Sequence, residues 1–538
     1  MLSSNMAVKK IKAPRYSFFS IAFTTINGVG CLINTPKKIP LRLMKNNSTS
    51  VAVIGSGVAG LSVAIRLALQ GKEVVVFEQN PYTGGKVTAF EKQGFRFDMG
   101  PSLFTMPHLV EELFELAGRT PKDYFQYHTH DEVCRYFWLD GKQITLYPSV
   151  EKNVEAITTV FGKESGEGVR KYFDDARKKF ELTAPFFLES SLHKMKTFLS
   201  PRVLQVVSEI PRLGLFSTLD EQNKRYFKEP KLVQLFNRYA TYNGSSPYQT
   251  PGIMQMISHL EHGMGTHFPV GGMHSISQSL TKLAEELGVQ FELNSKVEQI
   301  LIEEKKVCGV VVNGAERMFE LVVCNSDIKH AYQELLPKKV RRPKKTLAQE
   351  PSSSALIYYW GIGQTFPELD LHNIIFSEYY KQEFDRIRTN GPFWEDPTIY
   401  VHISNRLEDN DAPKGKDSWF VMVNVPYDQG QDWEDIVGKV RRKLIERMSA
   451  VLGQDITPLI ETEEILTPPQ IQHRTSSVGG ALYGTSSNER MAAFLRHSNK
   501  SSSVKGLYFC GGSAHPGGGV PLCILSGKIA AEWIEEDE

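Results

Sequence analysis

The sequence has few cysteines, no excess charge of either sign and no long hydrophobic run in its main part. Its six cysteines stand far apart, without a CxxC pair or a histidine at metal-ligand spacing, so we expect no disulfide and no metal site. Lysine plus arginine (62) nearly equals aspartate plus glutamate (61), which argues against nucleic acid as a partner. No run of about twenty apolar residues follows residue 50, so we expect no transmembrane helix there.

Acidic residues are missing from the first fifty positions, although eight lysines and arginines occur there. The stretch 17–33 is apolar behind a basic start and is therefore similar to a signal or transit peptide. Alternatively, Met44 is the true start of the protein, because it lies just before the first motif. We expect residues 1–47 to form a basic N-terminal extension outside the folded domains.

Glycines crowd the junction between a β-like run and a helix-like run in VAVIGSGVAGLSVAIRLALQG, residues 51–71. The β-branched run is typical of a buried parallel strand, and the helix is expected to end at Gly71. In a GxGxxG motif the first glycine permits a tight turn, the second lets a pyrophosphate approach the backbone, and the third lets the helix pack on the strand. The cofactor-binding residues predicted here are Gly55, Gly57, Val58, Ala59 and Gly60.

An acidic residue follows the next predicted strand. The segment KEVVVFEQN at 72–80 is typical of a strand whose last positions are Phe77 and Glu78. A carboxylate at this position accepts hydrogen bonds from the ribose hydroxyls of an adenosine and repels a 2′-phosphate. Strand, glycine turn, helix, strand and acid occur in the order of a dinucleotide-binding fold. Glu78 is therefore the predicted ribose ligand.

A glycine pair and a cation favour FAD over NAD. Gly84, Gly85 and Lys86 come shortly after the acid, where the longer FAD molecule needs more backbone N–H groups and a positive charge for its pyrophosphate. On these residues the sequence resembles flavoproteins of the amine-oxidase and carotenoid-desaturase superfamily, in which the cation is usually arginine. Lysine keeps the charge but lacks the bidentate geometry of arginine.

Two later segments have the pattern of further cofactor contacts. Residues 507–510 are predicted to be a strand and 511–519 a loop, and a helix from 520 onward would direct its positive end at the cofactor. Residues 275–314 are predicted to form a helix, a strand ending near Val297 and a β-hairpin turning at 303–306. The resemblance implies that Val297 meets the adenine through its backbone. It also implies cofactor contacts by Pro101, Ser102, Gly512, Gly519 and Val520.

Longer blocks narrow the resemblance. GPSLFTMP at 100–107, YATYNGSSPY at 239–248 and GGSAHPGGGVPLCILSGKIA at 511–530 are similar to carotenoid desaturases of the bacterial phytoene desaturase type. The similarity extends along essentially the whole chain after residue 50. Within that family, the hydroxycarotenoid 3,4-desaturases of Bacteroidetes-like bacteria are more similar than the phytoene enzymes to five blocks, namely GPSLFTMP, YATYNGSSPY, ALIYYWGI at 355–362, DLHNIIFSEYY at 370–380 and TSSVGGALYGTSSN at 475–488.

The resemblance implies an α/β fold (mixed α+β), with a Rossmann-like FAD-binding domain, an interleaved mixed β-sheet substrate domain and a helical membrane-contact region. The expected FAD domain is discontinuous and consists of residues 48–105, 262–330 and 500–538. Residues 106–261 and 331–499 are expected to bind the substrate and to contact the membrane.

The implied activity is that of an FAD-dependent desaturase that introduces a C=C bond into an acyclic carotenoid, in the first place at the 3,4 position of a 1-hydroxycarotenoid. A phytoene or diapophytoene desaturase is the second hypothesis. The third is a flavin-free prenyl-lipid binding module of the same fold, against which the intact Glu78 and glycines 517–519 argue. Oxygen and a quinone both stay open as the electron acceptor.

The sequence does not single out a catalytic acid or base, because a flavin accepts the hydride and the polyene of the substrate stabilises the remaining charge. His515 lies in the C-terminal glycine loop and is expected to shape this loop or to contact the flavin rather than to act as a base. Tyr239, Tyr242 and Asn243 are candidates for hydrogen bonding a substrate hydroxyl, since an unpaired buried hydroxyl is costly.

Amphipathic segments between residues 172 and 219 mix apolar residues with lysine and arginine. This pattern is typical of helices that lie on a bilayer surface, and equally of ordinary core helices. For a lipid substrate we expect peripheral attachment to the cytoplasmic side of the cell membrane.

Overall fold

The computed structural model describes residues 49–194, 197, 201–488 and 496–538. The N-terminal extension 1–47, with its alternative interpretations, lies outside the described residues. In the part of the chain that the structure describes, no helix combines the length and the apolar character that a membrane crossing requires.

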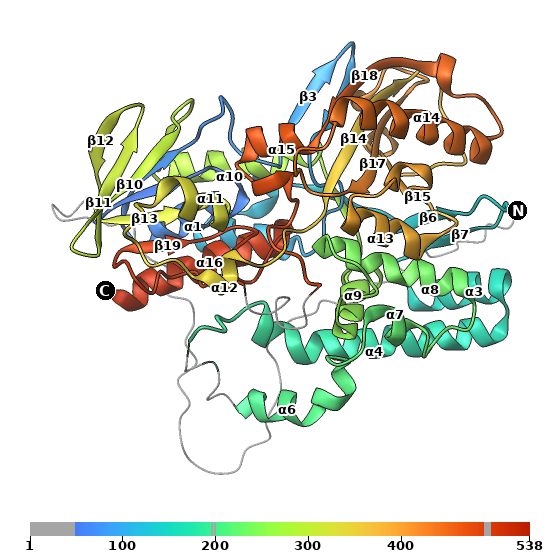
Figure 1. The fold of residues 1–538 in the computed structure, drawn as a ribbon, viewed down its shortest axis with the longest axis horizontal. Helices are drawn as coiled ribbons and strands as arrows, with labels where there is room; N and C mark the ends of the chain where they lie inside the picture. Colours follow the sequence, from blue (N-terminus) through green and yellow to red (C-terminus); the bar gives the residue numbers. More distant parts are fainter. Residues whose placement is uncertain (1–48, 195–196, 198–200, 489–495) are drawn as a thin grey trace, which may run out of the picture. The chain divides into compact units, whose positions relative to one another are not determined.

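A five-stranded parallel sheet carries the first glycine motif (Figure 1). Its strands, in spatial order, are β19 (Leu507–Phe509), β13 (Leu321–Cys324), β1 (Ser50–Ile54), β2 (Glu73–Phe77) and β9 (Gln290–Glu292). The central strand β1 is almost wholly buried, as its short run of β-branched residues predicts. All five strands lie within the three segments expected to form the FAD domain, and the boundaries of that domain stay a prediction.

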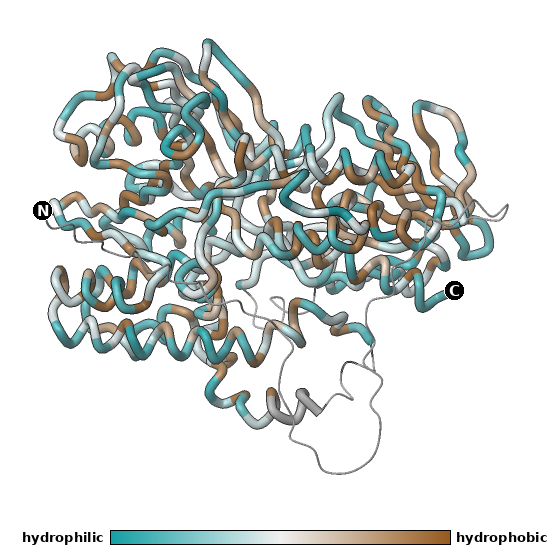
Figure 2. Tube along the Cα trace, turned by 180° about the vertical axis from the view of Figure 1, so that it is seen from behind, coloured by the Kyte–Doolittle hydropathy of each residue, from teal (hydrophilic) through white to brown (hydrophobic). Residues whose placement is uncertain are grey.

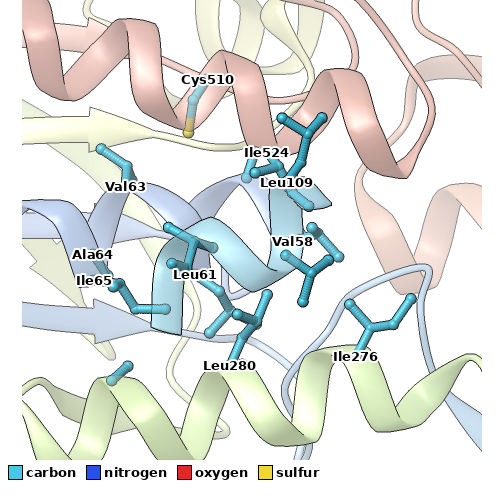
Figure 3. Packing of buried hydrophobic residues seen from close by; sticks show 14 of the residues in the cluster. Val58, Leu61, Val63, Ala64, Ile65, Leu109, Ile276, Leu280, Cys510 and Ile524 are labelled. Carbon is cyan, nitrogen blue, oxygen red and sulfur yellow. The ribbon is translucent and has the colours of Figure 1, made fainter. Parts of the chain in front are cut away.

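Three helices pack around this sheet, namely α1 (Val58–Leu69), α10 (His274–Glu286) and α16 (Val520–Asp537). Figure 3 shows Leu61 of α1 between α10, which contributes Leu280, and α16, which contributes Ile524. The approach of α16 to α1 is close, because a Cβ at Gly527 would lie 2.7 Å from the carbonyl oxygen of Ala59. The helix predicted to end at Gly71 does end there, since α1 stops just before this glycine, which has φ +82°.

A small antiparallel sheet follows β9 in the chain and consists of β10 (Val297–Glu303), β11 (Lys306–Val312) and β12 (Ala315–Met318). The predicted hairpin turn is confirmed, with Glu304 and Lys305 at φ 45° and 64°. The prediction of a strand ending near Val297 is wrong, because β9 ends at Glu292 and Val297 begins β10. Asn294 turns the chain between them at φ 53°, a conformation that asparagine tolerates better than most residues.

A seven-stranded mixed sheet forms the other large β-structure. In spatial order its strands are β18 (Ile460–Leu466), β14 (Ser354–Ile362), β17 (Asp417–Val425), β16 (Ile399–Ile403), β15 (His372–Ile375), β6 (Cys134–Phe137) and β7 (Gln143–Leu146). Strands β15 and β6 run parallel, and the other neighbours are antiparallel. Along β14 the side chains alternate: Tyr358 and Trp360 face helix α14 (Trp433–Leu452), and Ile357 faces the cavity described below.

Helices fill most of the chain between β7 and β8. They are α3 (Val150–Phe161), α4 (Lys163–Phe187), α6 (Pro201–Leu213), α7 (Leu219–Asn223), α8 (Pro230–Asn237) and α9 (Ile257–His262). Hydrophilic and hydrophobic residues alternate along α4 (Figure 2), and its buried face, with Tyr172, packs on Phe236 of α8. This helical cluster also contacts Tyr136 of β6, so it covers one end of the seven-stranded sheet.

Shorter elements connect these layers. They are β3 (Ala89–Lys92), β4 (Phe95–Asp98), α2 (His108–Leu116), β5 (Tyr127–Thr129), β8 (His267–Pro269), α11 (Ile328–His330), α12 (Lys344–Leu347), α13 (Tyr380–Thr389) and α15 (Pro468–Thr475).

Candidate active site

A cavity of about 570 Å³ opens at the carboxyl edge of the five-stranded sheet. The β1–α1 turn, the residues after β2 and the N-terminus of α16 line it there, and it continues between the seven-stranded sheet and helices α4 and α9. The carboxyl edge of a parallel sheet is where ligands bind in doubly wound folds. The cavity therefore joins the predicted cofactor residues to the predicted substrate region.

The N-terminus of α1 faces the cavity without a cap. Gly57 is the N-cap residue, makes no side-chain cap hydrogen bond, and no acidic residue stands in the first turn. Gly55, at φ +91°, makes the tight turn that leads into the helix. Since Gly57, Val58 and Ala59 all line the cavity, the first backbone N–H groups of α1 are available to an anionic group.

Gly60, the third glycine of the motif, does not line the cavity. A Cβ at this position would lie 2.1 Å from the carbonyl oxygen of Gly55 and 2.8 Å from Nδ2 of Asn325. That amide nitrogen donates to the same Gly55 oxygen at 3.1 Å. Gly60 therefore acts by allowing close packing of the helix on the turn, which is the part its place in the motif predicts.

Glu78 directly follows β2 and lines the cavity with only 4% of its surface exposed. One carboxylate oxygen accepts hydrogen bonds from the backbone N and Oγ of Ser56 at 2.9 and 2.8 Å. The other accepts from the backbone N and Nδ2 of Asn80 at 2.9 and 2.7 Å. These bonds hold the acid beside the glycine turn, the position that a ribose ligand requires.

The glycine pair lies against the first turn. Gly84 donates its N–H to the carbonyl oxygen of Ser56 at 3.0 Å, and a Cβ at Gly85 would lie 3.3 Å from Cα of Gly57. Both glycines line the cavity, as does Lys86. The Lys86 ammonium donates to the carbonyl oxygens of Ala481 and Leu482 at 3.0 and 2.9 Å. An ammonium has three donors, so one N–H is left for a ligand.

Burial lowers the pKa of Lys86 to about 8, although Asp327 opposes this shift. A second buried cation lies in the same cavity. Arg496 donates from Nη1 to the carbonyl oxygens of Tyr483 and Gly512 at 2.6 and 2.8 Å, and burial lowers its pKa to about 10. Arg496 was not predicted from the sequence, because this residue stands outside every recognisable motif.

The N-terminus of α16 repeats the arrangement of α1. Its N-cap, Gly519, makes no side-chain cap hydrogen bond, and no acidic residue stands in the first turn. A Cβ at Gly519 would meet nothing within 4 Å, which leaves open space in front of the helix. Gly512, Gly519 and Val520, for which cofactor contacts are predicted, all line the cavity, and Val297 lines it from the start of β10.

His515 holds the loop in front of α16. Its Nε2 lies 2.9 Å from the carbonyl oxygen of Ser190, and its own carbonyl oxygen accepts from Asn499 Nδ2 and Ser526 Oγ, both at 2.8 Å. Burial lowers the pKa of His515 to about 4, so the imidazole is neutral at neutral pH. His515 lines the cavity, and these contacts agree with the predicted role of shaping the loop.

A buried polar network lies in the wall of the cavity beyond the cofactor residues. Arg238 Nη2 donates to Glu261 Oε2 at 2.6 Å, and Tyr239 donates to the same oxygen at 2.7 Å. Tyr242 donates to the other oxygen of Glu261. Tyr242 lines the cavity together with Asn243, whereas Tyr239 does not. Arg238 and Glu261 were not predicted from the sequence. The position of Arg238 directly before the aromatic block at 239–248 was the one available signal, and it concerns only the arginine.

A second polar chain crosses the cavity wall. Ser102 Oγ lies 2.7 Å from the hydroxyl of Tyr400, which lies 2.8 Å from Nδ1 of His372. Ser102 and the neighbouring Pro101, for which cofactor contacts are predicted, line the cavity. Tyr400 and His372 come from strands β16 and β15 of the other sheet, so only the fold brings them to the predicted site.

The residues at the carboxyl edge fit an extended dinucleotide with a pyrophosphate. Two uncapped helix N-termini and two buried cations face one cavity, and a buried carboxylate lies at its adenosine end. Within the described ranges, no group of three or more His, Cys, Asp or Glu side chains could hold a metal ion. The site thus has the charges and the open backbone that FAD requires.

Comparison with known proteins agrees with this geometry. The model of the flavin containing amine oxidoreductase family matches residues 58–534. A 1-hydroxycarotenoid 3,4-desaturase from a Flavobacterium species is 48% identical over 482 residues, which cover 90% of this chain and 98% of that protein. A 4,4′-diapolycopene oxygenase from Methylomonas is 31% identical, over 91% of this chain and 99% of that protein. A phytoene desaturase from Fusarium fujikuroi is also 31% identical, over 92% and 90%.

Solved structures support the fold. An oxidoreductase from Methanosarcina mazei superposes with a TM-score of 0.59 at 17% identity, over 90% of this chain and all of that chain. Putrescine oxidase superposes with a TM-score of 0.60 at 12% identity, over 91% of this chain and 99% of that chain. The chain belongs to the flavin-containing amine oxidoreductase family and, within it, is an FAD-dependent oxidoreductase of the carotenoid desaturase group.

Proposed function

We propose that the protein introduces the 3,4 double bond into a 1-hydroxylated acyclic carotenoid. The observation that carries this proposal is the single cavity that runs from the FAD residues into an apolar channel. Apart from the polar network and the polar chain, the channel walls are mostly apolar and include Phe180, Leu188, Met254, Met256, Ile257, Leu260, Ile374, Phe384, Phe420 and Met422. The 48% identity to a 1-hydroxycarotenoid 3,4-desaturase supports this substrate over phytoene.

Desaturation removes two hydrogens from adjacent saturated carbons, one as a hydride and one as a proton. Bound FAD supplies the hydride acceptor. The positive charge left on the substrate is allylic and spreads into the neighbouring polyene, so the chain does not have to supply a strong counter-charge. The apolar walls hold the reacting C–H bond in place and exclude water, which would otherwise trap the cation.

The uncapped N-termini of α1 and α16 and the ammonium of Lys86 bind and orient the cofactor in this proposal. The N-terminus of α16 would also stabilise negative charge that develops in front of it. The family assignment favours an enzyme over the flavin-free binding module, because the acid, the glycine turns and both cations that a flavin requires are present. A protein base is not part of the proposal.

Expression of the full chain in a carotenoid-producing host tests the proposal. Parallel hosts supply a 1-hydroxylated acyclic carotenoid or phytoene, and the same hosts without the expressed chain serve as the control. Conversion of the hydroxylated carotenoid alone, with a red shift of one added double bond, is the expected result. Conversion of phytoene would instead support the phytoene or diapophytoene hypothesis. Turnover also needs an electron acceptor, and assays of purified protein with oxygen or with a quinone would distinguish these two.

We further propose that the protein attaches peripherally to a membrane and takes up its substrate near the end of α4. Phe180 and Leu188 at this end line the cavity, and Phe216, after α6, is 70% exposed. Co-sedimentation with lipid vesicles tests this proposal, and Phe216→Asp should weaken binding. Exposed Tyr379, which is 60% exposed, provides the matched control Tyr379→Asp. Equal loss in both variants would contradict attachment through the α6 side.

A further inference from the structure

His372 is a buried histidine that no part of the proposed chemistry uses. It begins β15, is 4% exposed and lines the cavity. Ile374, two positions along the same strand, also lines the cavity, so both side chains lie on the sheet face that forms the channel wall. His372 is thus a polar side chain in an otherwise mostly apolar surface.

Only one of its two ring nitrogens has a partner. Nδ1 lies 2.8 Å from the Tyr400 hydroxyl, which lies 2.7 Å from Ser102 Oγ, while Nε2 is buried without any hydrogen-bond partner. Of the described residues that line the cavity, His372 is the one with a buried side-chain polar atom that lacks a partner. An unpaired buried nitrogen costs free energy, and such a group in a native structure nearly always pairs with protein, an ordered water or a ligand.

Both candidate tyrosines and the neighbouring arginine already have hydrogen-bond partners. The Tyr242 hydroxyl donates to Glu261, and the Tyr239 hydroxyl donates to the same carboxylate and lies outside the lining. Arg238 is bound to Glu261 and to the hydroxyl of Tyr136. Nε2 of His372 is therefore a polar atom of a cavity-lining residue that still lacks a partner, whereas both tyrosine hydroxyls expected to bind the substrate are already paired.

His372 is neutral, because burial and the neighbouring His402, His130 and Arg238 hold its pKa well below the ordinary value, with Asp370 opposing. In a neutral imidazole one nitrogen donates and the other accepts. Whichever way the Ser102–Tyr400–His372 chain is oriented, Nε2 can pair with a hydroxyl group, since a hydroxyl both donates and accepts.

The polar chain also leads back to the cofactor residues. Ser102 belongs to the segment after Gly100, and a Cβ at Gly100 would lie 2.0 Å from the carbonyl oxygen of Lys86. His372 is thus tied through two hydrogen bonds to the segment that packs on the FAD residues. In a 1-hydroxycarotenoid the hydroxyl carbon is separated by one carbon from the bond to be desaturated. A partner for this hydroxyl must therefore lie where the channel meets the cofactor site.

We propose that Nε2 of His372 is the hydrogen-bond partner of the substrate's tertiary hydroxyl group and sets the preference for hydroxylated over non-hydroxylated carotenoids. The inference rests on the proposed function. Ser102 and Tyr400 are positioning residues in this assignment, because they hold Nδ1 and fix the tilt of the ring.

Two substitutions separate the two nitrogens. His372→Asn keeps a polar atom near the place of Nδ1 and removes Nε2, whereas His372→Gln reaches the place of Nε2. The assay compares a 1-hydroxylated acyclic carotenoid with the same carotenoid lacking the hydroxyl, using purified holoenzyme whose flavin absorbance reports correct assembly. We expect His372→Asn to lower kcat/KM for the hydroxylated substrate by about 10- to 100-fold. The non-hydroxylated substrate should change several-fold less, and His372→Gln should recover much of the selectivity.

His402 provides the matched control. It stacks on His372 with ring centroids 5.0 Å apart and also has an unpaired Nε2, but it does not line the cavity. His402→Asn should leave the substrate preference unchanged. An equal loss for both substrates in His372→Asn, or the same shift of preference in His402→Asn, would overturn the assignment.

A fourth variant covers the case in which His372→Asn does not assemble. Tyr400→Phe removes the hydroxyl that fixes Nδ1 and should lower the preference for the hydroxylated substrate in the same direction; an unchanged preference would contradict the assignment. Wild-type protein is assayed alongside. If the wild type converts only the non-hydroxylated carotenoid, the proposed function itself fails. If the wild type prefers the hydroxylated carotenoid and His372→Asn keeps that preference, only the assignment of His372 fails.

Discussion

Arg238 and Glu261 form an ion pair 2.6 Å long in the wall of the channel, with side chains only 8% and 2% exposed. Removing one partner of such a pair leaves an uncompensated buried charge. We therefore expect Arg238→Met to lower the free energy of unfolding by about 3–5 kcal/mol. The double variant Arg238→Met with Glu261→Gln should recover part of this loss. Denaturant unfolding of the wild type, Arg238→Met and the double variant measures the three free energies of unfolding. A double variant no more stable than Arg238→Met would contradict the claim that the unpaired charge of Glu261 causes the loss.

Lys86 predicts a pH dependence of cofactor binding. Its pKa of about 8 means that the side chain is charged at pH 7 and loses its charge as the pH rises through 8 in the cofactor-free protein. Affinity for FAD, measured by titration of the apoprotein, should therefore fall between pH 8 and 9.5, by at most about tenfold per pH unit for one coupled proton.

Two variants at this position isolate the charge. Lys86→Arg should keep its affinity through pH 9.5, because arginine stays protonated there. Lys86→Met should bind FAD weakly at pH 7 and should lose the fall above pH 8. A fall of the same size in all three proteins would assign the titration to a group other than Lys86.

Gly60 and Gly438 offer a matched pair of glycines within helices. A Cβ at Gly60 would lie 2.1 Å from the Gly55 carbonyl oxygen, whereas a Cβ at Gly438 of α14 would meet only Arg442 Nη1, at 3.9 Å. Gly60→Ala should destabilise the protein by about 1–3 kcal/mol and reduce its flavin content. Gly438→Ala should stabilise it by about 0.5–1 kcal/mol. Thermal unfolding together with flavin absorbance compares them, and a fully loaded, stable Gly60→Ala protein would refute the packing role.

Glu383 of α13 predicts a pH-dependent stability. Burial raises its pKa to about 7, although Thr398 and Ser377 donate hydrogen bonds to it. The folded state therefore binds a proton that the unfolded state has lost between pH 4.5 and 7, so this group makes stability fall as the pH rises through that window. Above pH 7 the cost of the buried charge is fully present.

Glu383→Gln should remove this cost, because a neutral amide can accept from the Thr398 backbone N–H with its oxygen and donate to the hydroxyls of Thr398 and Ser377 with its nitrogen. The gain in the free energy of unfolding should reach up to about 3 kcal/mol at pH 8 and should be small at pH 5. Asp385→Asn, a change at a half-exposed position of the same helix, serves as the control. A Glu383→Gln gain that is equal at both pH values would contradict the burial argument.

Local patterns allowed most of the cofactor half of the site to be predicted, since its residues other than Arg496 stand in contiguous motifs or in short segments beside them. The turn at Gly55 and the loop before Val520 are strand–loop–helix junctions, and Glu78 directly follows a strand. All three meet at one sheet edge because parallel strands share the same carboxyl end. The misplaced strand at Val297 shows the limit of this approach. A short apolar run does not reveal whether it ends one strand or begins the next. Val297 begins β10 because it pairs with Val312 of β11.

The sequence by itself determined that this chain binds FAD through a Rossmann-like domain and resembles carotenoid desaturases, because those features are carried by contiguous motifs. Only the tertiary structure decided which side chains wall the channel. His372 and Tyr400 come from neighbouring antiparallel strands and Ser102 from a distant loop, and Arg238 meets Glu261 from a separate helix. Pairing, burial and the lack of a partner at Nε2 are properties of packing between distant segments, which no local pattern encodes.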